Sequence, residues 1–261
     1  MSLANLRGFA IDLDGCIWAG HTLLPGAADF VAALRAAGRR VVYVTNSSRE
    51  LSQGLSERLT RLGIATPAGD VLAALELLGE TIRRRLGPVR VLPLGTAEMS
   101  RVLEAAGHAV VGMGEWSRAQ AVAIGNDPAF DFARLRAASR AVAAGATFFT
   151  VNLDARLPVA PGEFDPGCGA LAEAIAIAGG ARPVVIGKPH RPIFDMALER
   201  LGCRPGEAAM VGDSLATDIT GGREAGMFTV WIDPSGEGGG EGRASLTVRS
   251  LEELLELWTR A

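Results

Sequence analysis

Cysteine is scarce in this chain, and long apolar runs are missing from it. The 261 residues include three cysteines, Cys16, Cys168 and Cys203. They lie far apart and form no C-x-x-C pair, which argues against a disulfide framework and a zinc site. No apolar run approaches the roughly 20 residues of a membrane helix, and no charged N-terminal segment precedes such a run. We therefore expect a soluble, cytoplasmic protein that does not bind membranes.

Positive charge and aromatic residues are also in short supply. The formal net charge is −3 at pH 7, and 5% of the residues are aromatic. A broad basic surface for nucleic acid is therefore not expected. The one basic run, at 83–85, fits the solvated last turn of a helix. Hydrophobic residues make up 48% of the chain, which is enough for a large buried core.

Short apolar runs alternate with amphipathic segments along the chain. Strands are predicted at 8–11, 40–44, 89–94, 121–125, 147–151, 183–187, 208–212 and 228–232. Helices are predicted at 27–37, 51–62, 130–144, 168–178, 192–201 and 251–258. Continuous Val- and Ile-rich strands separated by helices indicate a parallel sheet covered by helices. We therefore predict an α/β fold with a doubly wound parallel sheet. The glycine-rich stretch at 235–242 is predicted to be a surface loop.

Four of the apolar strands end directly in compact polar motifs. The motifs are D-L-D-G at 12–15, T-N-S-S at 45–48, G-K-P-H at 187–190 and G-D-S at 212–214. In open parallel sheets, ligands bind outside the carboxyl ends of the strands. If the four strands are neighbours, their motifs converge on one crevice that holds carboxylates, a lysine, and hydroxyl and amide donors.

Carboxylates dominate this predicted crevice, which favours a hard cation. Mg²⁺ prefers oxygen ligands, so Asp12 and Asp213 are candidate ligands for it. The metal would also relieve the repulsion between Asp12 and Asp14. A carboxylate nucleophile beside Mg²⁺ suits phosphoryl transfer. Asp14 would then serve as the general acid for the leaving oxygen and as the general base for water.

Neutral and basic donors would complete a receptor for phosphate. Thr45 and Lys188 can bind a dianionic oxyanion together with backbone N–H groups. Those N–H groups belong to Asn46 and Ser47. The expected ligand is therefore a small phosphorylated metabolite.

The four motifs, in this order and each after an apolar strand, resemble those of the haloacid dehalogenase superfamily in its phosphatase form. The resemblance implies that Asp12 is the nucleophile, which forms an aspartyl-phosphate, and that Asp14 is the general acid/base. It also implies that Thr45 and Lys188 hold the phosphate. Mg²⁺ would be bound by Asp12, Asp213 and the backbone carbonyl of Asp14.

Four more residues lie close to these motifs in the sequence. The resemblance implies that Asp218 orients the Lys188 amine or a metal-bound water. Ser214 is interpreted as a turn-former that can donate one hydrogen bond. His190 is expected to begin the following helix rather than to act in catalysis. Cys16 either packs beside the site or is an oxidation-sensitive neighbour of it.

The spacing of the motifs predicts an inserted domain. The gap between Asp14 and Thr45 is short, whereas the gap between Thr45 and Lys188 can hold a second domain. Segments 123–135 and 150–171 are similar to the α/β cap of the class IIA branch. That branch includes nitrophenylphosphatase-like and ribonucleotide monophosphatase-like proteins.

The resemblance therefore implies two domains. A Rossmann-like core is expected from 1–86 and 183–261, and the cap from 87–182. Asn152 and Asp154 are candidates for a substrate-facing rim of the cap, although an Asx turn is an equally open interpretation. A homodimer that forms through the cap is expected by analogy.

Three alternatives to a phosphatase share some of these features. A haloacid dehalogenase would not need Asp14. A phosphomutase would need a cap inserted soon after the first motif, which the short gap before Thr45 disfavours. A phosphate-ester-binding regulatory protein without turnover stays open, although such a protein would be expected to lose Asp12 or Lys188. The physiological substrate is not identified by the sequence.

Overall fold

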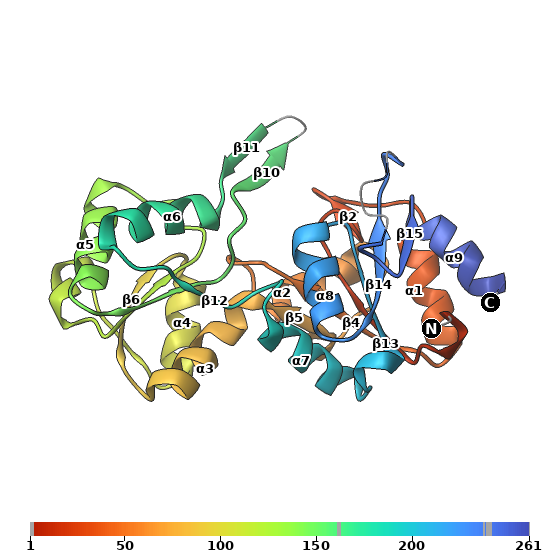
Figure 1. Cartoon of the computed structure of the whole chain (residues 1–261), viewed down its shortest axis with the longest axis horizontal. Helices are drawn as coiled ribbons and strands as arrows, with labels where there is room; N and C mark the ends of the chain where they lie inside the picture. Colours follow the sequence, from red (N-terminus) through yellow and green to blue (C-terminus); the bar gives the residue numbers. More distant parts are fainter. Residues whose placement is uncertain (1–2, 161–162, 237, 239–241, 261) are drawn as a thin grey trace. The chain divides into compact units, whose positions relative to one another are not determined.

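The computed structural model describes residues 3–160, 163–236, 238 and 242–260, and these form two compact units (Figure 1). The first unit contains the chain up to Thr45, the segment Ser52–Leu72 and the chain from Lys188 onward. The second unit contains Asn46–Leu51 and Ala73–Gly187. The second unit therefore includes the predicted cap at 87–182 and extends beyond it at both ends.

A parallel sheet forms the centre of the first unit, in the strand order β15–β14–β13–β1–β4–β5. Its strands are β1 (Gly8–Ile11), β4 (Arg40–Thr45), β5 (Val71–Ala73), β13 (Ala208–Gly212), β14 (Phe228–Ile232) and β15 (Leu246–Val248). β13 and β4 lie on either side of β1 and run parallel to it. The carboxyl ends of these three strands therefore lie next to one another, and three of the predicted motifs follow them.

Helices cover both faces of this sheet. They are α1 (Ala27–Ala36), α2 (Ser52–Arg61), α7 (Arg191–Leu201), α8 (Thr220–Glu224) and α9 (Leu251–Arg260). Phe9 packs edge-on against Phe30 of α1 and Trp258 of α9, with ring centroids 6.0 and 5.4 Å apart. Its neighbour Gly8 faces α7, since an added Cβ there would lie 3.2 Å from the Cβ of Leu201. Successive residues of a strand point to opposite faces, so the predicted doubly wound fold is confirmed.

The second unit is built on a smaller parallel sheet in the order β12–β9–β8–β6–β7. Its strands are β6 (Arg90–Leu94), β7 (Ala109–Val110), β8 (Ala121–Ile124), β9 (Thr147–Thr150) and β12 (Val184–Val185). Its helices are α3 (Ala74–Leu86), α4 (Ala97–Ala105), α5 (Phe132–Ala143) and α6 (Cys168–Gly179). Helices α5 and α6 pack together, and their buried alanines share one apolar core with Val122 and Phe148 of the sheet.

Helix α3 explains why this unit begins before the predicted boundary. An added Cβ at Gly79 of α3 would lie 2.7 Å from both the Cβ of Ala106 and the carbonyl oxygen of Val102. Only a glycine permits so close an approach between α3 and the end of α4. The helix therefore belongs with the segment that follows it.

The condition that all four strands are neighbours is not met, and the strand at 183–187, expected in the core from 183 onward, lies in the second unit. In the structure, β12 pairs with β9 of the second sheet. The backbone N–H groups of Ile186 and Gly187 extend this pairing to the carbonyls of Thr150 and Val151, at 3.0 and 2.8 Å. The apolar run suits either parallel sheet, and its composition does not distinguish them. Lys188 is the first residue after this run to belong to the first unit.

Two antiparallel hairpins were not predicted. One joins β2 (Trp18–Ala19) to β3 (Thr22–Leu23), and the other joins β10 (Arg156–Ala160) to β11 (Glu163–Pro166). The first follows the D-L-D-G motif directly. The glycine-rich stretch at 235–242 lies partly outside the described residues. Within the described ranges, no helix has both the length and the apolar character to cross a membrane.

Candidate active site

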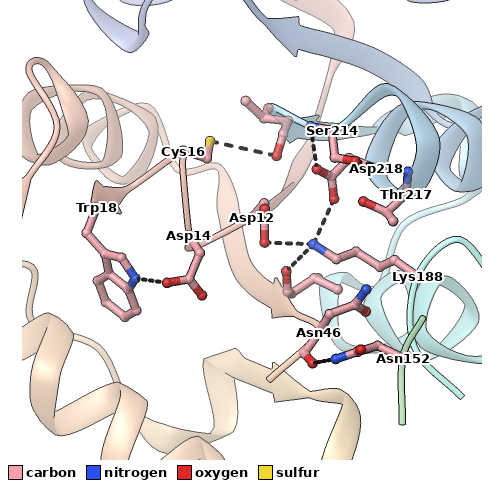
Figure 2. Close-up of polar contacts among 12 residues, drawn as sticks. Asp12, Asp14, Cys16, Trp18, Asn46, Asn152, Lys188, Ser214, Thr217 and Asp218 are labelled. Carbon is pink, nitrogen blue, oxygen red and sulfur yellow. Dashed lines mark hydrogen bonds and ion pairs between the residues drawn. The ribbon is translucent and has the colours of Figure 1, made fainter. Parts of the chain in front are cut away.

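Asp12 and Lys188 form the centre of the site in the first unit. Asp12 is buried directly after β1, and its backbone N–H donates to the carbonyl of Val211 on β13 at 2.9 Å. The Lys188 Nζ lies 2.6 Å from Oδ1 of Asp12 and 2.7 Å from Oδ1 of Asp218 (Figure 2). It also donates to the carbonyl of Val44 on β4 at 3.0 Å. The buried ammonium group therefore links the ends of three neighbouring elements.

Asp218 is held in place by the turn that carries it. The backbone N–H of Ser214 donates to Oδ2 of Asp218 at 3.1 Å, and the Ser214 hydroxyl accepts from the N–H of Thr217 at 3.3 Å. A π-helical turn, Leu215–Ile219, places the fully buried Asp218 under the strand end. Gly212 leaves the space for it, since an added Cβ would overlap the Asp218 carboxylate. The predicted partnership of Asp218 with the Lys188 amine is present in this geometry.

Three carboxylates lie close together in the site, and two of them contact Lys188. Asp12, Asp213 and Asp218 offer oxygens that all lie within 4.8 Å of one another. Burial and then the charge of Asp218 raise the pKa of Asp12 well above its ordinary value. Partial desolvation of the carboxyl and the charge of Asp218 raise the pKa of Asp213 to about 6. Burial alone would lower the pKa of Lys188, but Asp12 and Asp218 outweigh it and raise that pKa. The site therefore carries an excess of negative charge.

This donor set fits a hard divalent cation. Carboxylate oxygens are the ligands that Mg²⁺ prefers, and a cation would offset the excess charge. Asp213 follows β13, and its backbone carbonyl accepts from Nε1 of Trp231 at 2.8 Å. Gly15, at φ +82°, leaves room beside it, because an added Cβ would overlap the Asp213 carboxylate. The chemistry of the donor set therefore suits Mg²⁺.

Asp14 is exposed, and its side chain has a partner that sequence reasoning missed. The indole Nε1 of Trp18 donates to Oδ1 of Asp14 at 2.8 Å (Figure 2). The guanidinium of Arg58 on α2 lies over the same indole, 4.1 Å from the ring centroid. The only signal in the sequence was the tryptophan four residues after Asp14, inside the β2–β3 hairpin.

The predicted phosphate-binding residues are divided between the two units. Thr45 is buried at the end of β4 in the first unit, beside the Val44 carbonyl that binds Lys188. Asn46 and Ser47 belong to the second unit. There the carbonyl of Ser47 accepts from the N–H of Leu75 at 3.2 Å.

The two predicted rim residues of the cap differ in exposure. Asn152 is buried: its Nδ2 donates to the carbonyl of Asn46 at 2.7 Å, and its Oδ1 accepts from the N–H of Asp154 at 3.0 Å. This is the Asx turn that the sequence left open. Asp154 itself is exposed. Of the pair, only Asp154 therefore presents its side chain to solvent.

Cys16 and His190 occupy structural positions. Cys16 is buried, with its Sγ 3.9 Å from the carbonyl of Val211, and burial raises the pKa of its thiol well above the ordinary value. A thiol with a raised pKa is a poor thiolate source. His190 precedes the first residue of α7, as expected.

The chain is similar in sequence to known hydrolases. A family model described as haloacid dehalogenase-like hydrolase matches residues 9–109, and a second model of HAD-hydrolase-like proteins matches 185–248. Human glycerol-3-phosphate phosphatase is 35% identical over 254 residues, which span 87% of this chain and 79% of that protein. Human chronophin is 33% identical over 240 residues, spanning 87% of this chain and 81% of its own.

Solved structures give the same result for the fold. A 4-nitrophenylphosphatase from Thermotoga maritima superposes with a TM-score of 0.86 and 28% identity, covering 97% of this chain and 98% of its own. NagD from E. coli K-12 superposes with a TM-score of 0.85 and 26% identity, covering 97% of this chain and 98% of its own. The chain therefore belongs to the haloacid dehalogenase-like hydrolases and is a phosphomonoesterase. Within that superfamily its relatives are those of the class IIA branch, as its sequence motifs suggested.

Proposed function

We propose that this protein hydrolyses small-molecule phosphomonoesters with Mg²⁺ and through an aspartyl-phosphate. The observation that carries this proposal is the buried Lys188 ammonium between Asp12 and Asp218, in a site with three carboxylates. A buried lysine so placed favours the ionised form of Asp12 against the effect of burial and can also bind a phosphate oxygen. A carboxylate with this support is an effective nucleophile toward phosphorus.

The residues divide the reaction into two balanced steps. In the first, a carboxylate oxygen of Asp12 attacks phosphorus while the bond to the leaving oxygen breaks, and Asp14 gives its proton to that oxygen. In the second, Asp14 takes a proton from water as the water oxygen attacks the phosphoryl group. Inorganic phosphate leaves, and Asp12 is again a carboxylate. Thr45 and Lys188 hold the phosphoryl oxygens throughout, with Asn46 and Ser47 as further donors.

Asp12, Asp213 and the backbone carbonyl of Asp14 would hold the metal. When bound, Mg²⁺ supplies positive charge that offsets the carboxylates and the phosphate dianion. Asp218 orients the Lys188 amine, and Ser214 keeps Asp218 in place through its backbone N–H. In this arrangement Lys188 is the protein cation that compensates the negative charge of Asp12.

The substrate class is a small phosphorylated metabolite. Support comes from the relatives, which include a glycerol-3-phosphate phosphatase that is 35% identical to this chain. An alkyl leaving group needs a proton from a general acid, which is the role given to Asp14. Glycerol 3-phosphate is therefore the first ester to examine, and Asp154 is the rim residue proposed to select among esters.

The test is phosphate release from a panel of small esters that includes glycerol 3-phosphate, phosphoglycolate and 4-nitrophenyl phosphate. Each is assayed with Mg²⁺ and with a chelator, for the wild type and for Asp12→Asn. We expect release that needs Mg²⁺ and falls by at least about 10³-fold in the variant, because an amide does not attack phosphorus. Equal thermal stability of the two proteins is the control for folding.

Two results would contradict the proposal. Substantial turnover by Asp12→Asn would remove Asp12 from the mechanism. Binding of esters without release by the wild type would instead favour the phosphate-ester-binding regulatory protein.

A further inference from the structure

Asp14 is exposed, yet its carboxylate is tied to a buried donor. The Trp18 side chain that donates to it is fully buried. Backbone hydrogen bonds fix the residue itself: the N–H of Trp18 donates to the carbonyl of Leu13 at 3.0 Å, and its carbonyl accepts from the N–H of Gly15 at 2.8 Å. An exposed carboxylate without such a partner would sample several rotamers. This one is anchored to the core of the first unit.

Arg58 holds the tryptophan from a different element. Its guanidinium carbon lies 4.1 Å from the centroid of the Trp18 ring, well within the reach of a cation–π contact. Arg58 also donates to the carbonyl of Gly20 in the β2–β3 turn. Helix α2 is therefore connected both to the indole and to the turn of the hairpin that carries it.

We propose that Trp18, supported by Arg58, is a positioning residue that sets the carboxyl group of Asp14 for proton transfer. The inference rests on the proposed role of Asp14 as general acid/base. Because the indole N–H occupies Oδ1, the transferable proton resides on Oδ2. As the phosphorus–oxygen bond breaks, this proton passes from Oδ2 to the leaving oxygen, and Asp14 becomes a carboxylate. In the second step the same oxygen takes the proton of the attacking water.

The substitution that isolates this role is Trp18→Phe. Phenylalanine keeps an aromatic ring beneath Arg58 but removes the N–H donor. Phenyl phosphate and 4-nitrophenyl phosphate are assayed side by side with Mg²⁺, since they differ little in size but greatly in how much their leaving groups need a proton. We expect kcat/KM to fall about tenfold for phenyl phosphate and about twofold for 4-nitrophenyl phosphate, as for the loss of one hydrogen bond.

Arg58 provides a second, independent variant. Arg58→Met should also lower the ratio of kcat/KM for phenyl phosphate to kcat/KM for 4-nitrophenyl phosphate. The fall in this ratio should be smaller than in Trp18→Phe, because the indole donor remains. Arg58→Lys should restore most of it, because a cation over the ring is retained. If Trp18→Phe does not fold, this pair of variants decides the question by itself.

Trp258→Phe is the matched control. Trp258 also lies in the first unit, packs against Phe9, and has the guanidinium of Arg39 5.5 Å from its ring centroid. The same chemical change there should leave the ratio between the two esters unchanged. A change equal to that of Trp18→Phe would mean that general destabilisation, not positioning, causes the effect.

Asp14→Asn separates failure of this inference from failure of the mechanism. Suppose that Asp14→Asn lowers kcat/KM more for phenyl phosphate than for 4-nitrophenyl phosphate, whereas Trp18→Phe lowers it equally for both esters. Positioning by Trp18 is then refuted, and the acid role of Asp14 stands. If Asp14→Asn itself does not discriminate, the acid role fails and the inference fails with it.

Discussion

Replacing Lys188 by methionine tests whether one buried ammonium compensates the carboxylates around it. In the wild type, Lys188 is buried and lies 2.6 and 2.7 Å from Asp12 and Asp218. Methionine has a similar length but no charge, so both carboxylates would lose their buried partner. Removing one member of a buried ion pair typically costs about 3–5 kcal/mol. For a chain of this size that corresponds to a fall in Tm of about 6–20 °C.

The direction in which stability changes with pH follows from the raised pKa of Asp12. Burial raises the pKa of Asp12 above its ordinary value, so the folded state binds more protons than the unfolded state once the pH exceeds about 4. The free energy of unfolding therefore decreases as the pH rises through that window. Without Lys188 this loss of stability with rising pH should be greater. The Tm of Lys188→Met should therefore fall further below that of the wild type at pH 8 than at pH 5.

The assay is thermal unfolding of metal-free protein in chelator at pH 5 and pH 8. Arg84→Met is the control, because the pair of Arg84 with Glu80 is exposed and such pairs contribute only about 0–1 kcal/mol. Equal Tm values for Lys188→Met and the wild type at pH 8 would refute the reasoning. A deficit that does not change with pH would show that lost packing, rather than charge, is responsible.

Two further predictions concern the metal site and the second unit. Asp213→Asn should abolish the rise in Tm that Mg²⁺ causes in the wild type. At a Mg²⁺ concentration of a hundred times the Kd, that rise corresponds to about 2.7 kcal/mol of added stability. If the variant shows a rise as large as that of the wild type, Asp213 is not a ligand of the metal. Asn152→Ala should destabilise the second unit by about 1–3 kcal/mol, because it leaves the part-buried carbonyl of Asn46 without that donor. Hydrogen exchange at the Asp154 amide, which donates to the Asn152 side chain, would report this loss, and unchanged protection there would contradict it.

The strands and most helices could be predicted because each contains a strong apolar pattern. β1 was predicted with its observed bounds, and the helix at 27–37 ends one residue earlier in the structure. The candidate carboxylates could also be found, because three of them follow strands that are neighbours in the sheet. For these elements the local sequence and the tertiary fold favour the same structure.

Other features depend on information that the local pattern does not contain. The run at 183–187 suits either sheet, and only its pairing with β9 decides between them. The two-residue strands of the β2–β3 hairpin are too short to show a period. The boundary between the two units falls between Thr45 and Asn46, which are adjacent in a single motif. Its position therefore depends on packing and not on the local sequence. The donor to Asp14 was missed because nothing in the local sequence pairs Trp18 with that carboxylate, although the N–H of a buried indole requires a partner.

The indole beside Asp14 also has a spectroscopic consequence. Trp18 is in hydrogen-bond contact with a carboxylate proposed to change its protonation state during turnover, and it lies against a guanidinium group. Its emission should therefore respond to the charge of the site. The protein carries four tryptophans, so replacing the other three by phenylalanine would leave a single native fluorophore at the site. Binding and turnover could then be followed optically, without any added label.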